Sequence, residues 1–136
     1  MTTVRYFPTT RFPKVRFFDI NNPSAEQAVD WQPRADVLER DNAYEVVLEL
    51  PGVGRESVNV SFENDVLKVE GEVAREEENT HYYRRERHTG TFSRSFRVPE
   101  HGVDADGISA NFDNGLLTVS LPKAAEVLPK KIEIAG

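Results

Sequence analysis

The stretch Ala110–Lys123, which reads ANFDNGLLTVSLPK, decides the fold class of this chain. Apolar and polar side chains alternate on both sides of Asn114-Gly115, as expected for two strands that each bury one face. Asn-Gly tolerates the positive φ angles of a tight turn, so the two strands are expected to form a hairpin. The second strand is expected to end before Pro122. The stretch therefore predicts antiparallel β structure.

Short alternating runs of the same kind recur between Trp31 and this hairpin. Turn-forming residues separate them, among them Pro51-Gly52 and Glu63-Asn64-Asp65. Only residues 25–29 and 123–127 have weakly helical patterns. Strands at roughly ten-residue spacing, with turn signals between them, predict an all-β domain that is a sandwich or a barrel.

Length and composition limit the possible classes of protein. A chain of 136 residues is long enough for one domain with a sizeable core, plus some tail. Its net charge of -6 does not suggest a dedicated nucleic-acid binder, whose binding domain would be strongly basic. The absence of cysteine excludes disulfides, thiolate metal sites and cysteine nucleophiles. No apolar run is long enough for stable membrane insertion and no secretory signal is recognisable, so a cytoplasmic location is expected.

Sequence motifs for catalysis or cofactor binding are missing. The chain has no G-x-x-x-x-G-K-[ST] phosphate loop, no G-x-G-x-x-G loop and no serine in a G-x-S-x-G elbow. The histidines His81, His88 and His101 lack the spacing of a metal site. Asp104 and Asp106 lie near glycines, where turn formation explains them. We therefore expect no enzymatic activity, no cofactor and no metal.

Residues 1–30 differ from the rest of the chain in charge and composition. The first 18 residues carry four basic residues and no acid. They also hold five aromatic residues: Tyr6, Phe7, Phe12, Phe17 and Phe18. Pro8 and Pro13 oppose a long helix there, which also argues against an amphipathic transit peptide. We expect a flexible arm, and an arm that binds anions or membrane surfaces is one alternative.

A long connection, residues 74–89, does not fit a simple hairpin. Loops of this length are usually functional or disordered. Tyr82 and Tyr83 indicate that part of the loop packs on something. Arg94 then interrupts an apolar alternating row, and a buried arginine must be paired because an isolated charge away from water is costly. Arg94 is either an edge residue that reaches water or one half of an ion pair across a subunit boundary.

The C-terminal residues read KKIEIAG and place Ile132 and Ile134 on one side of an extended segment. So short a tail cannot bury both side chains by itself, so they dock either on their own chain or on another copy. Burying each isoleucine contributes roughly 1.5 to 3 kcal/mol, whereas ordering each tail residue costs about 1 to 2 kcal/mol. One docked tail is therefore marginal, and several tails hold a closed assembly together through effective concentration. This balance predicts an oligomer that exchanges subunits.

In their order along the chain, these motifs resemble those of the small heat-shock proteins, whose core is the alpha-crystallin domain. The resemblance is carried by Pro33-Arg34-Ala35-Asp36, Leu50-Pro51-Gly52-Val53, residues 86–99 (ERHTGTFSRSFRVP), residues 110–123 and Ile132-Glu133-Ile134. It implies an immunoglobulin-like β-sandwich over residues 31–123, preceded by the flexible arm of residues 1–30 and followed by a tail of residues 124–136. It also implies an ATP-independent holdase of the bacterial and plant type, which binds partly unfolded client proteins and prevents their aggregation.

The resemblance further implies a homo-oligomer that is built from dimers. A strand from the long loop would cross to the sheet of a partner, with a dimer interface that includes Tyr82, Tyr83, Arg84 and Arg94. The tail would anchor itself through Ile132 and Ile134 in a groove of a neighbouring copy. From two strands near that edge, we expect the groove to be lined by Val58, Val60, Leu117 and Val119.

The five aromatic residues of the arm are candidates for contact with clients, and packing inside the oligomer is the alternative role for them. The arm is short for the family, which leaves the size of the assembly open. A second class of protein also remains open: a CS-domain sandwich that serves as a co-chaperone or interaction module. Such a module resembles this fold but lacks the terminal Ile-x-Ile and the long swapped loop.

Overall fold

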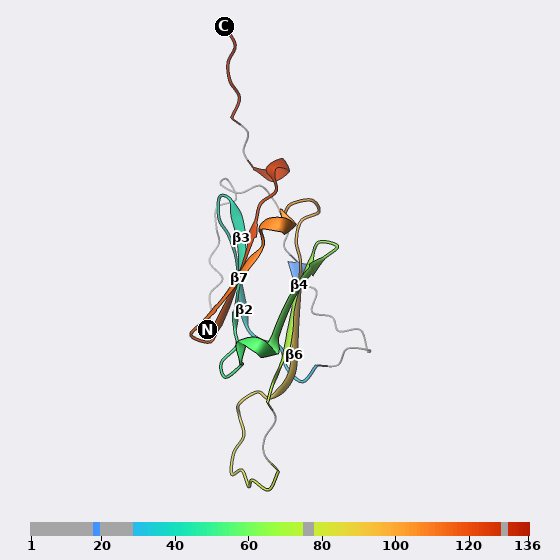
Figure 1. The fold of residues 1–136 in the computed structure, drawn as a ribbon, viewed down its shortest axis with the longest axis vertical. Helices are drawn as coiled ribbons and strands as arrows, with labels where there is room; N and C mark the ends of the chain where they lie inside the picture. Colours follow the sequence, from blue (N-terminus) through green and yellow to red (C-terminus); the bar gives the residue numbers. More distant parts are fainter. Residues whose placement is uncertain (1–17, 20–28, 75–77, 129–130) are drawn as a thin grey trace.

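The computed structural model describes residues 18–19, 29–74, 78–128 and 131–136 (Figure 1). Two antiparallel sheets of four strands each pack face to face. The first has the order β1-β6-β5-β4, with β1 (Phe18–Asp19), β4 (Val58–Glu63), β5 (Val66–Val73) and β6 (Gly90–Arg97). The second has the order β2-β3-β8-β7, with β2 (Ala35–Glu39), β3 (Ala43–Glu49), β7 (Ser109–Asp113) and β8 (Leu116–Pro122). The expected all-β fold is confirmed, and it is a sandwich.

Two hairpins turn on residues with left-handed backbone conformations. Asn64 and Asp65, which connect β4 to β5, have φ angles of 51° and 61°. Asn114 and Gly115, which connect β7 to β8, have φ angles of 52° and 76°. Two successive positive φ angles match the right-handed twist of the flanking strands. The hairpin expected from Asn114-Gly115 is therefore present, and its second strand ends at Pro122 itself.

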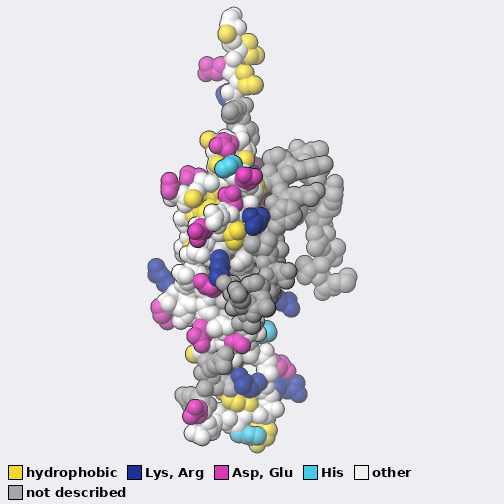
Figure 2. Space-filling view, turned by 90° about the vertical axis from the view of Figure 1, so that its right-hand side faces the viewer, with side chains coloured by type: hydrophobic (Ala, Val, Ile, Leu, Met, Phe, Trp, Pro, Cys, Tyr) yellow, Lys and Arg dark blue, Asp and Glu magenta, His cyan; other side chains and the backbone are white. Residues whose placement is uncertain are grey.

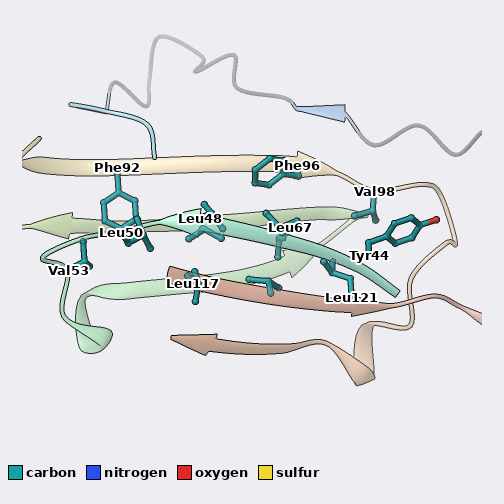
Figure 3. Packing of buried hydrophobic residues seen from close by; sticks show 13 residues of the cluster. Tyr44, Leu48, Leu50, Val53, Leu67, Phe92, Phe96, Val98, Leu117 and Leu121 are labelled. Atoms are coloured by element: carbon teal, nitrogen blue, oxygen red, sulfur yellow. The ribbon is translucent and has the colours of Figure 1, made fainter. Parts of the chain in front are cut away.

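The core lies between the sheets, where each inner strand buries every second side chain. The alternation is complete in β3, where Tyr44, Val46 and Leu48 are buried and their neighbours are more exposed. Figure 3 shows Phe92 projecting from β6 into the space between the two sheets. Burial of each such side chain contributes about 1.5 to 3 kcal/mol. The buried apolar residues are Tyr44, Val46, Leu48, Leu50, Val53, Leu67, Val69, Phe92, Phe96, Val98, Leu117, Val119 and Leu121.

Helical structure in the described residues is limited to three 3-10 turns, η1 (Arg55–Ser57), η2 (Ala105–Gly107) and η3 (Ala125–Val127). The weak helical pattern of residues 123–127 therefore produced one short turn. Lys123 does not enter it, because its backbone N–H donates to the carbonyl of Asn42 at 2.9 Å. The other helical pattern, residues 25–29, lies almost wholly outside the described residues.

The segment of residues 30–34 fastens the junction of arm and sandwich to β6. The carboxylate of Asp30 accepts hydrogen bonds from the backbone N–H of Thr91 at 2.8 Å and from its hydroxyl at 3.2 Å. Gly90 has a φ angle of 91°, and a Cβ at this position would collide with the carboxylate of Asp30. Glycine is therefore strongly favoured at the start of β6.

β1 shows that the N-terminal arm is not wholly separate from the sandwich. Phe18 and Asp19 pair antiparallel with Arg97 and Phe96 of β6. A strand added here covers the N–H and C=O groups that β6 would otherwise leave unpaired at the edge of its sheet. The proposed boundary at residue 31 therefore cuts off one short strand, and residues 1–17 and 20–28 lie outside the described part of the chain.

The long loop and the C-terminal tail project from the sandwich at opposite ends of the molecule (Figure 1). The loop leaves from the end of β5 and returns at the start of β6. The tail follows η3 and leads away from both sheets. Both projections are therefore available to other molecules.

Candidate functional site

A groove opens between the edge strands β4 and β7, beside the start of β8. Its volume is about 340 Å³, and its lining residues are Arg55, Val58, Val60, Ala110, Asn111, Phe112 and Leu117. Val58 and Val60 stand on the inward face of β4, but β4 is the last strand of its sheet, so their side chains stay half-exposed. The groove at the open edge of the sandwich thus combines apolar side chains with polar groups, among them Arg55 and Asn111.

Three of the four residues expected in this groove line it, and Val119 does not. The side chain of Val119 is 0% exposed and belongs to the core, where its strand position pairs with Val46 of β3. Leu117 shares the same face of β8 and is also buried in the core, but it additionally lines the groove. Alternation assigns both to the inner face and cannot tell which of them also faces a groove.

Phe112 and Arg55 are groove residues that the sequence reasoning missed. Phe112 stands opposite Leu117 in the β7–β8 ladder, so the hairpin register carried the signal for it. Arg55 lies in η1, the turn before β4, and no periodic pattern pointed to it. Ala110 and Asn111 also line the groove and were not among the expected residues.

The tail presents its two isoleucines to solvent. Ile132 is 85% exposed and Ile134 is 96% exposed. Figure 2 shows hydrophobic side chains along the projecting tail, away from the body of the sandwich. In this structure the described tail residues 131–136 therefore do not fold back onto the groove of their own chain.

Lys123, the residue directly before the tail, is held in place by a buried ion pair. The ammonium Nζ of Lys123 lies 3.1 Å from Oε1 of Glu39, and the Lys123 side chain is only 4% exposed. The same ammonium lies 5.2 Å from the ring centroid of Tyr44. Burial, together with the charge of Glu39 and a hydrogen bond to it, raises the pKa of Tyr44 to about 12. These three residues join β2, β3 and the end of β8 at the point where the tail leaves.

The long loop packs mainly on itself and not on its own sandwich. Tyr83 is 97% exposed, and its ring meets the ring of His81 edge to face, with the ring centroids 5.0 Å apart. The guanidinium of Arg85 lies 5.2 Å from the ring centroid of Tyr82, and Arg84 forms a 3.0 Å ion pair with Glu86. Figure 2 shows hydrophobic, basic and histidine side chains gathered on this projection. The loop thus offers an aromatic and charged surface to another molecule.

Arg94 lies half-buried on β6 beside the segment of residues 30–34. Its Nη1 donates to the carbonyl of Pro33 at 2.9 Å, and its guanidinium lies 5.2 Å from the ring centroid of Phe96. Next to it, Trp31 stacks on His88 with ring centroids 5.2 Å apart. Within one chain, Arg94 therefore links β6 to the segment of residues 30–34 through its hydrogen bond to Pro33. Its expected ion pair across a subunit boundary stays a prediction.

The candidate client-binding residues fall largely outside the described part of the chain. The described part of the chain does not include Tyr6, Phe7, Phe12 and Phe17. Phe18 is described only as a member of β1. Among the described residues, no group of three or more His, Cys, Asp or Glu side chains lies close enough to hold a metal ion. In the same residues, no helix has the length and apolar character needed to cross a bilayer.

Comparison with known proteins places the sandwich and its tail in one family. Residues 36–135 match the model of the Hsp20/alpha crystallin family. The chain belongs to this family. As a family member it is a small heat shock protein, which implies a chaperone role.

The similarity to individual small heat shock proteins covers most of the chain. The chain is 37% identical over 106 residues to small heat shock protein C2 of Rickettsia felis, and this match covers 76% of the chain and 68% of the relative. The chain is 39% identical over 127 residues to the 17.6 kDa class I heat shock protein 1 of Arabidopsis thaliana, and this match covers 88% of the chain and 81% of the relative. The solved structure of heat shock protein 16.0 from Schizosaccharomyces pombe superposes with a TM-score of 0.67 at 38% identity, covering 86% of this chain and 82% of that one.

The longer bacterial relatives extend beyond the matched region. The match spans 68%, 62% and 64% of the length of three of them. Their whole-protein activities and partners therefore do not follow from the match alone.

Proposed function

We propose that this small heat shock protein is an ATP-independent holdase that binds partly unfolded proteins and prevents their aggregation. The observation that carries the proposal is the pairing of an exposed tail with an open groove. Ile132 and Ile134 are largely exposed, while β4, β7 and β8 of the same chain form a groove, lined in part by Val58, Val60 and Phe112, that the described tail residues do not occupy. Two surfaces that each need an apolar partner support a reversible link between copies.

The link is proposed to be weak enough to open. Burial of the two isoleucines contributes roughly 1.5 to 3 kcal/mol each, and ordering the tail costs about 1 to 2 kcal/mol for each residue fixed. A single tail therefore detaches readily, whereas several tails in one assembly hold it together. Every detachment exposes the two isoleucines of the tail and the valines of the groove, and such apolar side chains suit the apolar segments of an unfolding protein.

The pairing of chains into dimers is proposed to use the long loop. Tyr82, Tyr83 and Arg84 lie on that projection, where this chain alone leaves Tyr83 almost fully exposed. β2 is an edge strand of its sheet, so its outer backbone groups can accept a strand from a partner. Arg94 lies on β6, near the junction of arm and sandwich, and completes the proposed interface.

Clients are proposed to contact the arm as well as the groove. Tyr6, Phe7, Phe12, Phe17 and Phe18 give the arm a concentration of aromatic side chains in a segment where Pro8 and Pro13 oppose a single rigid helix. Large aromatic side chains bury much apolar area at a contact, which suits them to exposed apolar segments of many sequences.

The test of this function is suppression of aggregation without nucleotide. Purified protein, mixed with a heat-labile client at near-equal subunit concentrations, is expected to abolish light scattering on heating. The mass of the protein, measured by native mass spectrometry, is expected to exceed that of a dimer and to fall on heating. Full aggregation of the client at a several-fold excess of the protein would exclude the holdase. A particle that stays a single chain at all temperatures would instead favour a monomeric interaction module.

A further inference from the structure

Among the described residues that line the groove, Arg55 is the only one with a charged side chain. The other lining residues are Val58, Val60, Ala110, Asn111, Phe112 and Leu117, so the groove combines apolar side chains with neutral polar groups and one cation. Arg55 comes from η1, which directly precedes β4, so it marks the end of the groove where β4 begins. The neighbouring acid, Glu56, has its carboxylate against Gly54. An anion that enters the groove from outside therefore meets Arg55.

The tail carries one anion between its two apolar side chains. In an extended segment, Ile132 and Ile134 point to one side and repeat at about 6.6 to 6.8 Å, because each strand residue advances about 3.3 to 3.4 Å. Val58 and Val60 on β4 have the same two-residue spacing. Glu133 points to the opposite side of the tail, toward the rim of an occupied groove. A long, exposed arginine at that rim can reach it.

We propose that Arg55 pairs with Glu133 of the tail of another copy, and that repulsion between Arg55 and Lys131 makes the docked tail run antiparallel to β4. The inference rests on the proposed docking of the tail and adds a rule for its direction. Two isoleucines separated by one residue fill an apolar slot in either direction, so apolar contacts alone leave the direction open. The charges on the outward row decide it.

The outward row consists of Lys131, Glu133 and Ala135. If the tail ran parallel to β4, Lys131 would lie at the Arg55 end of the groove, where the two positive charges repel each other. If the tail runs antiparallel, uncharged Ala135 lies at that end and Glu133 is the nearest charge to Arg55. Ile134 then packs near Val58, and Ile132 packs near Val60.

The Arg55–Glu133 pair is expected to lengthen the time that a docked tail stays bound, whereas the isoleucines provide most of the binding. Ion pairs at an exposed rim contribute modestly, which corresponds to a change of about two- to five-fold in the rate at which a tail leaves its groove. Added salt screens the pair, since the Debye length is only about 10 Å at 0.1 M ionic strength. The apolar contacts of the two isoleucines do not share that dependence.

A charge-swap experiment on the full chain tests the pair. Subunit exchange is followed by native mass spectrometry after heavy-isotope-labelled and unlabelled protein are mixed. Glu133→Lys and Arg55→Glu are each expected to speed exchange about two- to five-fold, and the double variant is expected to restore the wild-type rate. Both residues are exposed, so neither change threatens the fold. The control is Glu126→Lys, the same charge change in η3, which is expected to leave the rate unchanged.

Cross-linking tests the direction, because the chain contains no cysteine of its own. Glu56→Cys in η1 is combined with either Ala135→Cys or Lys131→Cys, and a short thiol-reactive cross-linker is added. Links between chains are expected mainly in the variant with Ala135→Cys. A preference for Lys131→Cys would overturn the antiparallel direction.

The variant Ile132→Ala with Ile134→Ala separates this inference from the proposed function. If that variant falls to dimers while the charge variants exchange at the wild-type rate, the tail is the link and the Arg55–Glu133 pair is wrong. If the effects of the two charge changes simply add in the double variant, the pair is also wrong. If the isoleucine variant keeps the wild-type mass and exchange rate, the docked tail and the charge pair are both wrong.

Discussion

The ammonium of Lys123 lies 3.1 Å from the carboxylate of Glu39 while only 4% of the lysine side chain is exposed. Charged side chains are rarely buried so deeply unless they are paired. The pair joins the residue directly after β8 to β2, just before the tail begins. It fixes where the tail leaves the sandwich.

Lys123→Ala is expected to reduce the free energy of unfolding by roughly 3 kcal/mol. Removal of one partner leaves a poorly solvated charge, and the loss is at the lower end of the usual range because 22% of the Glu39 side chain is still exposed. Urea unfolding at one fixed protein concentration measures it, since assembly itself contributes to stability. Arg40→Ala is the control: it removes the surface pair Arg40–Glu45, in which Arg40 is 61% exposed, and should cost less than about 1 kcal/mol. Equal losses would contradict the prediction.

Tyr44 is expected to make the fold sensitive to alkali. Its pKa rises from 10.0 to about 12 in the folded chain, so between these values the unfolded chain has lost a proton that the folded chain keeps. The stabilisation is therefore fully present below pH 10 and is lost as the pH rises to about 12, by about 2 to 3 kcal/mol in total. Urea unfolding across this pH range measures the slope. Tyr44→Phe should flatten it, and an unchanged slope would assign the sensitivity to other groups.

Gly90→Ala is expected to destabilise the sandwich more than Gly52→Ala does. Both glycines have positive φ angles, 91° and 77°, which cost a residue with a Cβ about 1 to 2 kcal/mol. A Cβ at Gly52 meets open space, whereas one at Gly90 collides with the carboxylate of Asp30. The Gly90 variant should also lose the hydrogen bonds that Thr91 donates to the Asp30 carboxylate, at about 1 kcal/mol each. Thermal melting of the two variants side by side compares the two losses.

Tyr82→Ser with Tyr83→Ser is expected to break the dimer without harming the fold. The substitutions are made in a chain that already carries Ile132→Ala and Ile134→Ala and is expected to be a dimer. Because Tyr83 is 97% exposed in the single chain, its loss costs the sandwich little, and the circular dichroism spectrum should stay the same. Native mass spectrometry should show single chains. Glu100→Ser, an exposed change elsewhere, should leave the dimer intact, and a dimer that survives the tyrosine changes would exclude the loop as the interface.

The hairpins and the core could be predicted from local patterns. Asn114-Gly115 specified its turn because few other residue pairs accept two positive φ angles in succession. Period-two alternation correctly placed Tyr44, Val46 and Leu48 on the inner face of β3. These features depend on residues that are close together in the sequence, so the sequence alone contains the information.

Features that depend on the position of a strand within its sheet could not be predicted in the same way. Val119 and Leu117 have the same alternation phase on β8 and both are buried in the core, yet only Leu117 also lines the groove that β4 and β7 form with it. Glu39 and Lys123 are far apart in the sequence, and only the strand order brings them together. The order of strands is set by the packing of the whole domain, which period-two patterns do not encode.

The opposite placement of the long loop and the tail gives the molecule two poles (Figure 1). A perturbation at one pole leaves the other untouched, because the whole length of the sandwich separates them. Dismantling is therefore expected to occur in stages, with warm conditions releasing the tails first and leaving paired units that are still folded. Under the proposed assembly, these paired units are expected to rebuild the larger particle on cooling, when their tails dock again.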